Sequence, residues 1–445
     1  MRHRVPAVSR STPGVPEGHT AASAAGPGTK HPPMAVLRRL GPGLVTGAAD
    51  DDPSGIATYS QVGAQFGYTM GWTVVLSLPL MAAVQEISAR LGCVTGQGLA
   101  ATLRDVAPRP VLAVLVSLLV AANVINLGAD LGAMADAVRL LVGGPQGAYA
   151  VALAAVCAAT EIWLAYRRYV LVLKWMTLFL FAYVALVLSL DLPWREVLEG
   201  AALPRLTLDR ASLTALVAVL GTTISPYLFF WQASEEVEEQ LLTGHLTALR
   251  ARPLAAAAQL ARIRTDTWIG MGISNVVALA IIVGTAATLH AAGVTKVATA
   301  ADAAAALRPI AGRHASVVFA AGILGTGLLA VPVLAGSAAY AVGEAMHWKV
   351  GLSLRATEAR AFYGVIAAAT LVGSGIVFSP LAPMDALFWS AVLNGIISAP
   401  MIVAMLVLAS RTDVMGTLTL PAGLKTLGWA TAGVMAAVTA AMLLS

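Results

Sequence analysis

The chain has 445 residues, of which 58% are hydrophobic and 11% are charged, and its formal net charge is +5. A soluble domain carries about 25% charged residues, so the composition excludes a water-soluble enzyme or binding domain of ordinary size and indicates a surface that faces lipid. The basic residues do not gather in one motif, so we expect no nucleic-acid partner. Cys93 and Cys157 lack metal-ligand or disulfide spacing, and we interpret them as small buried side chains.

Residues 1–34 are rich in Pro, Gly, Ser, Thr and Ala and lack the apolar core of a signal peptide. They predict a disordered cytosolic tail in front of a transmembrane domain at 35–445. Apolar stretches long enough to cross a bilayer, roughly 20 residues each, then follow one another. We place eleven spans, at about 38–66, 68–92, 109–141, 145–166, 168–190, 211–240, 266–290, 313–345, 358–378, 381–410 and 421–444.

Lysine and arginine predict the orientation, because cytosolic loops carry an excess of both. Of the 28 basic residues, about 21 fall on the side of the N-terminus and about 7 on the other side. We therefore expect a multi-pass protein of the cell membrane with a cytosolic N-terminus and, after eleven spans, an extracytosolic C-terminus.

Two spans are interrupted in the middle. The first is broken at Asp52-Pro53-Ser54-Gly55, and the sixth is broken in the string GTTISPY at 221–227. Proline removes a backbone donor, and free backbone groups at membrane depth are tolerated only where they are buried in protein or line a cavity. If spans one to five (about 38–190) and six to ten (about 211–410) are inverted repeats, the breaks occupy matching positions, which indicates a transporter site at the midplane.

The first break carries three consecutive carboxylates, Asp50, Asp51 and Asp52. Consecutive helical residues lie about 100° apart, so these side chains cannot all avoid the protein interior. A carboxylate, free carbonyls and water form the ligand set of a hard divalent cation, and Asp52 adjoins the break. Alternatively, Asp52 caps the second half-helix, and Asp50 and Asp51 line a vestibule or lie behind the ligands.

The second break offers the hydroxyls of Thr222, Ser225 and Tyr227, although serine and threonine can also bond back to their own helix. Neither break carries Met, Cys or His, so we do not expect a soft or imidazole-rich metal site.

Other polar residues lie inside the predicted spans. Asp130 is ionisable and has no adjacent basic residue, so it could relay protons or pair with a distant arginine. Glu235 and Glu236, with Glu238 and Glu239, are interpreted as a solvated acidic face, and an ion path past Glu235 and Glu236 is the alternative. Asp52 and Asp130 could also form the dyad of an intramembrane aspartyl protease, but that would leave the matched breaks unexplained. Further candidates for the site or its surroundings are Asn123, Gln232, Asn394 and Ser398.

Several strings in the first three spans resemble the Nramp family of divalent metal transporters. They are Gly41-Pro42-Gly43, Asp52-Pro53-Ser54-Gly55, GAQFGY at 63–68, QEISARLG at 85–92 followed by Val94-Thr95-Gly96, and GADL at 128–131. The resemblance implies an all-α integral membrane protein with the LeuT-type fold: five-plus-five inverted repeats, broken helices one and six, and an eleventh helix. It also implies alternating access and a metal site that includes Asp52 and the position of Gly55.

The sequence departs from the family pattern at the site. The family motif Asp-Pro-Gly-Asn has Gly55 at its asparagine, and the motif Met-Pro-His reads Ser225-Pro226-Tyr227. A second family histidine is Gln232, an acid of span three is Ala133, and a glutamine of span ten aligns loosely with Ser398.

These departures change the expected ion. Losing the thioether removes the ligand that favours soft metals, while Mg²⁺ is usually held by one or two carboxylates and retains water. The pattern is similar to the magnesium-carrying branch of the family, which also carries manganese. Proton coupling becomes doubtful, and uptake driven by the membrane potential is plausible at about 4.6 kcal/mol per 100 mV for a dication.

We therefore expect a monomeric transporter rather than an enzyme, with a divalent metal as substrate, the lipid bilayer as surroundings and no cofactor. An amino-acid or amine symporter of the same fold is the alternative. Half-helix N-termini bind substrate carboxylates in such proteins, and the three aspartates argue against an anionic group but not against an amine.

Overall fold

The computed structural model describes residues 42–163, 178–243 and 248–445, and all regular elements in these ranges are helices. The predicted tail at 1–34 and the first part of the fifth predicted span lie outside the described residues. The first compact unit, Met1–Leu40, is likewise not described, and everything below concerns the second unit, Gly41–Ser445.

The helices reproduce the predicted spans. The first five correspond to α2 (Pro42–Asp50) with α3 (Pro53–Phe66), α4 (Gly71–Thr95), α6 (Arg109–Val142), α7 (Gln146–Trp163) and α9 (Phe181–Ser189). The next six correspond to α11 (Arg210–Thr223) with α12 (Pro226–Leu242), α13 (Pro253–Thr285), α16 (Ala315–Ala345), α17 (Arg360–Ile376), α18 (Pro383–Ser410) and α20 (Ala422–Leu444). Short helices join them: α5 (Leu99–Val106), α10 (Trp194–Ala202), α14 (Ala300–Ala305), α15 (Arg308–Ala311) and α19 (Thr412–Met415).

The seventh span shows the largest difference from prediction. Its helix begins at Pro253 rather than near residue 266. The prediction excluded residues 253–265 because of Arg262 and Arg264, whereas the helix includes them. Helix formation follows backbone hydrogen bonding and does not stop where hydrophobicity does.

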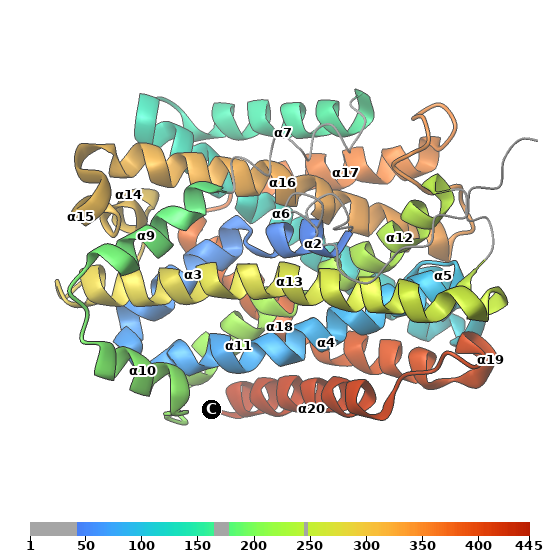
Figure 1. The fold of residues 1–445 in the computed structure, drawn as a ribbon. Helices are drawn as coiled ribbons and strands as arrows, with labels where there is room; N and C mark the ends of the chain where they lie inside the picture. The colour runs from blue at the N-terminus through green and yellow to red at the C-terminus, as the bar shows by residue number, and fades with distance from the viewer. Residues whose placement is uncertain (1–41, 164–177, 244–247) are drawn as a thin grey trace, which may run out of the picture. The chain divides into compact units, whose positions relative to one another are not determined.

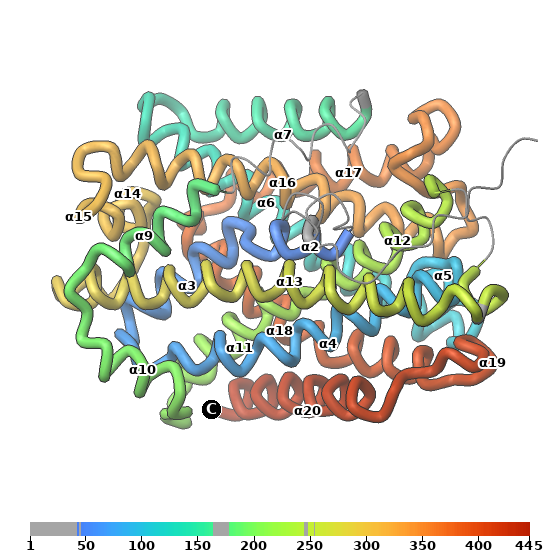
Figure 2. The backbone as a smooth tube through the Cα atoms, in the orientation of Figure 1, coloured from blue at the N-terminus to red at the C-terminus, as the bar shows by residue number. Residues whose placement is uncertain are grey.

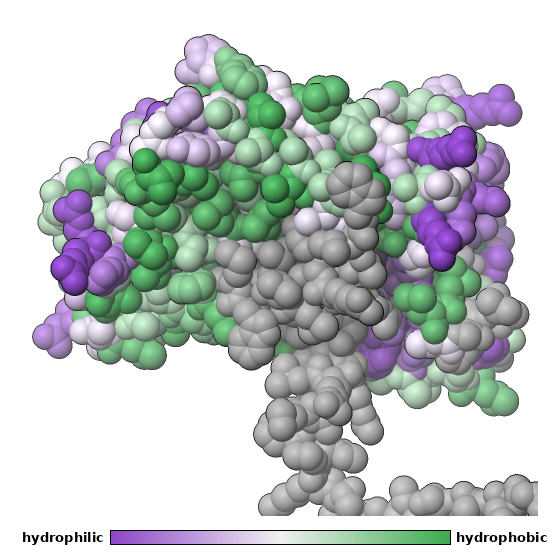
Figure 3. All heavy atoms as spheres, turned by 90° about the horizontal axis from the view of Figure 1, so that it is seen from above, coloured by the Kyte–Doolittle hydropathy of each residue, from purple (hydrophilic) through white to green (hydrophobic). Residues whose placement is uncertain are grey.

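The long helices run side by side, as the ribbon and the tube show (Figures 1 and 2). We call the end that holds α10, α14 and α15 the α10 end, and the end that holds α5 and α19 the α5 end. Seven stretches of the described chain are long and apolar enough to cross a membrane. Hydrophilic residues gather at both ends and apolar residues between them in the face shown in Figure 3. This is the pattern of a protein that spans a bilayer.

Glycines allow the half-helices to pack closely against neighbouring helices. A Cβ on Gly47 of α2 would lie 2.5 Å from the carbonyl carbon and oxygen of Gly270 on α13. A Cβ on Gly221 of α11 would lie 2.0 Å from the carbonyl oxygen of Ala391 on α18. Backbone therefore packs directly on backbone at both half-helices, and this brings the two breaks into the interior of the bundle.

The packing of α2 on α13 gives a stability prediction. In Gly47→Ala the added methyl must displace α13 backbone, and overpacking of this kind costs about 1–3 kcal/mol. We expect a lower midpoint of thermal unfolding for the detergent-purified protein. Gly272→Ala is the matched control, because a Cβ there meets nothing within 4 Å. Equal unfolding midpoints for the two variants would contradict the close packing.

Candidate metal site

The first break begins where α2 ends at Asp50 and α3 begins at Pro53. Asp52 has an extended backbone (φ −68°, ψ 170°), and its Oδ1 accepts hydrogen bonds from the Gly55 amide at 2.8 Å and the Ser54 hydroxyl at 2.6 Å. Asp52 is thus the N-cap of α3, as the capping alternative proposed. Proline at the first helical position needs no donor of its own and suits this helix start.

The second carboxylate oxygen of Asp52 faces other helices. Its Oδ2 accepts a hydrogen bond from Asn126 Nδ2 on α6 at 3.1 Å. The Tyr227 hydroxyl on α12 lies 3.2 Å from Oδ2 and 3.1 Å from the Ala49 carbonyl oxygen. Asn126 in turn accepts a hydrogen bond from Ser390 on α18 at 2.7 Å. Groups from three further helices therefore orient Asp52, which is only 1% exposed.

In the second break, α11 ends at Thr223 and α12 begins at Pro226. The Ser225 hydroxyl donates to the carbonyls of Gly221 at 2.7 Å and Thr222 at 3.0 Å, and the Thr223 hydroxyl donates to Val219 at 2.9 Å. Both side chains bond back to their own helix, as the alternative proposed. The Thr222 hydroxyl instead lies 3.5 Å from the Ser54 hydroxyl of α3, so Thr222 joins the two breaks.

Gly55 leaves space between the breaks. A Cβ at this position would lie 3.3 Å from Thr222 Oγ1 and from the Tyr59 ring, and 3.4 Å from the Asp50 carbonyl oxygen. A larger side chain would therefore displace these neighbours. With glycine, the Thr222 hydroxyl and the Asp50 carbonyl both border the same small region beside Asp52.

The other two aspartates lie against α13. The Ser274 hydroxyl is 2.6 Å from Asp50 Oδ2 and 3.0 Å from Asp51 Oδ1. Asp50 is fully buried, Asp51 is 7% exposed, and Asp50 Oδ1 has no hydrogen-bond partner. Among the described residues, no basic side chain forms an ion pair with Asp50, Asp51 or Asp52. Buried carboxylates need a cation or protons to compensate their charge, and the donor set fits a hard cation.

Other predicted residues lie close to the breaks with different partners. Ser398 of α18 donates to the Ile224 carbonyl at 2.6 Å and so contacts the second break through its backbone. Asn394 is buried, and its Nδ2 has no partner. Gln232 of α12 accepts a hydrogen bond from Thr46 of α2 instead of facing Asp52.

Two candidates for a proton or ion path lie on α6. Asn123 donates to the Leu334 carbonyl at 3.1 Å and so tethers α6 to α16. Asp130 is fully buried, and neither of its carboxylate oxygens has a hydrogen-bond partner. Asp130 therefore makes no hydrogen bond to Asp52.

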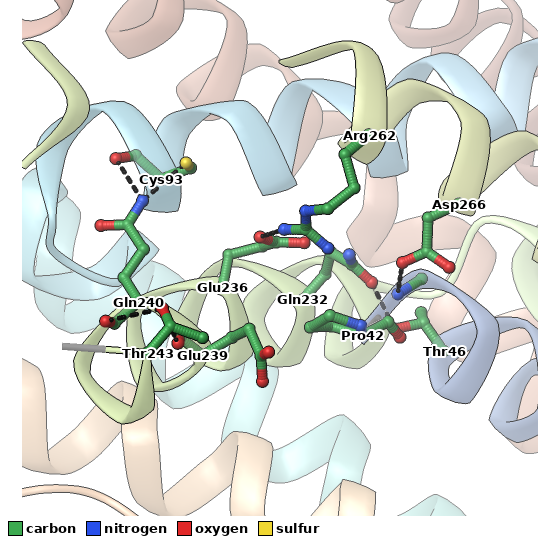
Figure 4. A network of polar contacts seen from close by, with 11 residues as sticks. Pro42, Thr46, Cys93, Gln232, Glu236, Glu239, Gln240, Thr243, Arg262 and Asp266 are labelled. Atoms are coloured by element: carbon green, nitrogen blue, oxygen red, sulfur yellow. Dashed lines mark hydrogen bonds and ion pairs between the residues drawn. The ribbon is translucent and has the colours of Figure 1, made fainter. Parts of the chain in front are cut away.

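The solvated acidic face predicted at the end of span six is wrong for two of its members. Glu236 is fully buried and forms a 2.6 Å ion pair with Arg262 of α13 (Figure 4). Glu235 beside it is half-buried. Glu238 is 9% exposed and accepts a hydrogen bond from the Leu352 amide at 2.6 Å. The end of α12 packs against neighbouring elements, so its carboxylates face partners rather than water.

The same region ties the half-helix α2 to its neighbours. Asp266 of α13 accepts a hydrogen bond from the Gly43 amide in the first turn of α2 at 2.8 Å, and Thr46 donates to Gln232 (Figure 4). Ser274, two turns after Asp266 on α13, holds Asp50 and Asp51 at the other end of α2. We call these contacts the α2 clasp.

The sequence patterns did not identify Asn126, Ser274 and Ser390 as site residues. Asn126 could have been found, because Asn123, Asn126 and Asp130 recur at intervals of three and four and so share one face of α6. Ser274 and Ser390 are single hydroxyls in apolar spans, and only the packing of α13 and α18 against the breaks identifies them.

Two broken helices that meet at buried carboxylates, within a bundle that spans the membrane, define a secondary transporter of the LeuT-fold class. Residues 43–445 match the family described as Nramp, natural resistance-associated macrophage protein-like. The chain belongs to this family, and it is accordingly a divalent metal transporter rather than an enzyme, with metal as its substrate and not as a cofactor.

One relative agrees with this assignment in sequence, and two solved structures agree with the fold. The divalent metal cation transporter MntH of Pectobacterium carotovorum is 30% identical over 299 residues, which cover 66% of this chain and 68% of the relative. The manganese transporter of Eremococcus coleocola, solved with an aromatic bis-isothiourea compound, has a TM-score of 0.71 at 20% identity and covers 95% of this chain and 89% of its own. The inward-facing structure of Mhp1 has a TM-score of 0.52 at 15% identity, with coverage of 91% and 90%.

The contacts of Asp52 predict a role for Asn126. Asn126→Ala removes the donor that holds Oδ2, and a hydrogen bond to a charged group contributes about 1.5–3 kcal/mol. We expect the affinity for Mn²⁺, measured by calorimetry on the purified protein, to fall about tenfold or more. The matched control is Asn123→Ala, one turn earlier on the same helix, whose partner is the Leu334 carbonyl. Equal losses in both variants would show that α6 acts only through packing.

Proposed function

We propose that this transporter carries Mg²⁺ and Mn²⁺ in preference to Fe²⁺ by alternating access, and that Asp52 is the charged ligand of the ion. The observation that supports this most is a buried carboxylate between two breaks that carry no Met, Cys or His. The described residues contain no group of three or more His, Cys, Asp or Glu side chains arranged to hold a metal. A cation that retains water and needs one or two carboxylates suits such a site better than one that needs a complete protein cage.

The proposed ligands come from both breaks. Asp52 supplies a carboxylate oxygen, Thr222 supplies its hydroxyl or carbonyl, and the backbones at Gly55 and Ser225 border the ion. The negative charges of Asp50 and Asp51 attract the ion and hold its water. Tyr227 and Asn126 keep Asp52 in position.

We propose that a cavity at the α10 end is the entrance of the route to the site. Its volume is about 390 Å³, and its walls include Ala57, Gln61 and Gln65, which follow one another along α3 at intervals of four residues from the Asp52 end. Six water molecules occupy roughly 180 Å³ at about 30 Å³ each. The cavity is therefore large enough for a dication with its first hydration shell.

The basic residues favour an α10 end that faces the outside of the cell. The described helix ends and loops at the α5 end carry most of the lysine and arginine, such as Arg250, Arg355 and Arg411. With this orientation the membrane potential drives a dication from the cavity to the cytosol. The same proposal includes Asp130 as a proton relay and an ion path past Glu235 and Glu236.

The α2 clasp would close the route toward the α5 end. While Asp266, Gln232 and Ser274 hold α2, backbone packs on backbone at Gly47 and leaves no passage. Release of the ion would require these bonds to open together, which is the kind of discrete two-state change that alternating access needs.

The central test replaces the charged ligand. In proteoliposomes, Asp52→Ala should reduce Mg²⁺ and Mn²⁺ uptake about 100-fold or more, because losing a carboxylate ligand costs several kcal/mol and each 1.4 kcal/mol is tenfold. Asp413→Asn, an exposed acid at the α5 end, is the control and should transport normally. Wild-type uptake by Asp52→Ala would overturn the proposal. The same liposomes should show no transport of amino acids or amines.

The missing thioether predicts how the ion selectivity can be changed. Ser225→Met adds a soft ligand at the second break, so Cd²⁺ should become a stronger competitor of Mn²⁺ uptake while Mg²⁺ transport falls. Ser225→Leu has a similar volume without sulfur and should lose Mg²⁺ transport without gaining Cd²⁺ competition. Strong Cd²⁺ competition in the wild type would contradict a site without a soft ligand.

The α2 clasp predicts a variant that opens more easily. Asp266→Asn weakens a charge-assisted bond to Gly43, so the state with α2 released should be more populated. A cysteine at Ala49, in a background with Cys93 and Cys157 replaced by serine, should then react several-fold faster with a membrane-impermeant maleimide applied from the α5 end. The control is Asp105→Asn, whose side chain is 48% exposed. Unchanged labelling in Asp266→Asn would show that Asp266 does not hold the closed state.

A further inference from the structure

A second cavity lies at the α10 end, on the side of the bundle where α20 packs against α11 and α18. Its volume is about 430 Å³, and its lining residues include Arg210, Trp389, Val392, Ile396, Met442 and Leu443. Val392 and Met442 are buried and belong to a separate apolar cluster between the three helices. We call this cavity the α20 groove.

The walls of the α20 groove combine an apolar floor with a polar part, to which Thr214 and Ser445 contribute beside the single basic residue Arg210. Arg210 is the first residue of α11 and is exposed, and within the described chain its guanidinium has no ion pair or hydrogen bond. The neighbouring Asp209 forms no ion pair with it, and its carboxylate instead accepts hydrogen bonds from Thr207 and Ser212. These bonds lower the pKa of Asp209 to about 2. Arg210 is thus an unpaired cation directly above an apolar groove.

The position of the α20 groove indicates which kind of molecule it binds. α20 is largely exposed along its apolar length, so it faces lipid. Trp389, 54% exposed, and Arg210 sit where the apolar part of the bundle meets its polar α10 end, and tryptophan and arginine at this depth are typical of contacts with lipid headgroups. We propose that the α20 groove binds one anionic phospholipid, with its phosphate on Arg210 and an acyl chain against Val392 and Met442.

Trp389 connects this lipid to the transport route. It lines both the α20 groove and the cavity that contains Gln61, so the two cavities share its indole as a wall. A lipid in the groove packs against one face of Trp389 and limits its movement away from the other cavity. An anionic lipid should therefore alter transport kinetics through Trp389 without contacting the ion.

Native mass spectrometry tests the site directly. The full detergent-purified chain is titrated with phosphatidylglycerol or with phosphatidylcholine of the same acyl chains. We expect wild type to retain phosphatidylglycerol about fivefold better, as one basic residue near an anionic headgroup predicts. Arg210→Gln should bind both lipids equally, and Arg195→Gln, a 91% exposed residue at the same end, should behave like wild type. Equal binding of both lipids by wild type, or an unchanged preference in Arg210→Gln, would overturn the proposal.

A second variant separates the groove from general surface charge. Ile396→Trp fills the groove and leaves Arg210 in place, so it should lose phosphatidylglycerol retention as well. Retention at the wild-type level would show that the lipid binds elsewhere, and inorganic phosphate should not displace the lipid. These measurements contain no metal, so their outcome is independent of the proposed ion selectivity.

Discussion

The structure depends on how the negative charge buried in its interior is compensated. Asp50, Asp51 and Asp52 lie buried at the first helix break, and no basic side chain of the described chain pairs with them. Hydrogen bonds from Ser54, the Gly55 amide and Asn126 orient the third carboxylate but do not neutralise it. Because an uncompensated carboxylate in a low-dielectric interior is costly, the site is stable only with a cation or with protons. A transporter can use this requirement, since the bound ion supplies what the protein lacks.

The surrounding fold serves to bring the two breaks together and to hold them. Small residues permit this: Gly47 lets α2 contact the backbone of α13, and Gly221 lets α11 contact that of α18. The same contacts make α2 a separable element, because it is short, ends at the break, and is held mainly by Asp266 and Ser274. The ion site and the proposed inner closure therefore share one half-helix, which would couple occupancy to the opening of the α5 end.

Much of the fold could be predicted from the sequence because the signals are local. Hydrophobic stretches predicted most of the helices within a few residues, the start of α13 excepted. Proline predicted both breaks, since a missing donor acts at its own position. Directions of side chains could not be predicted in this way. Thr222 and Ser225 lie close together in the same break. The Thr222 hydroxyl nevertheless faces the first break, whereas the Ser225 hydroxyl bonds back to its own helix. The same limit explains Glu236, whose burial under Arg262 depends on the packing of α12 against α13.

The most direct test of this account is anomalous diffraction from crystals soaked in Mn²⁺. The account predicts one strong peak between the two breaks, within ligand distance of Asp52 and of an oxygen of Thr222, with ordered water completing the coordination. A Mn²⁺ peak that is bound away from Asp52, or one with a nitrogen or sulfur ligand, would contradict it.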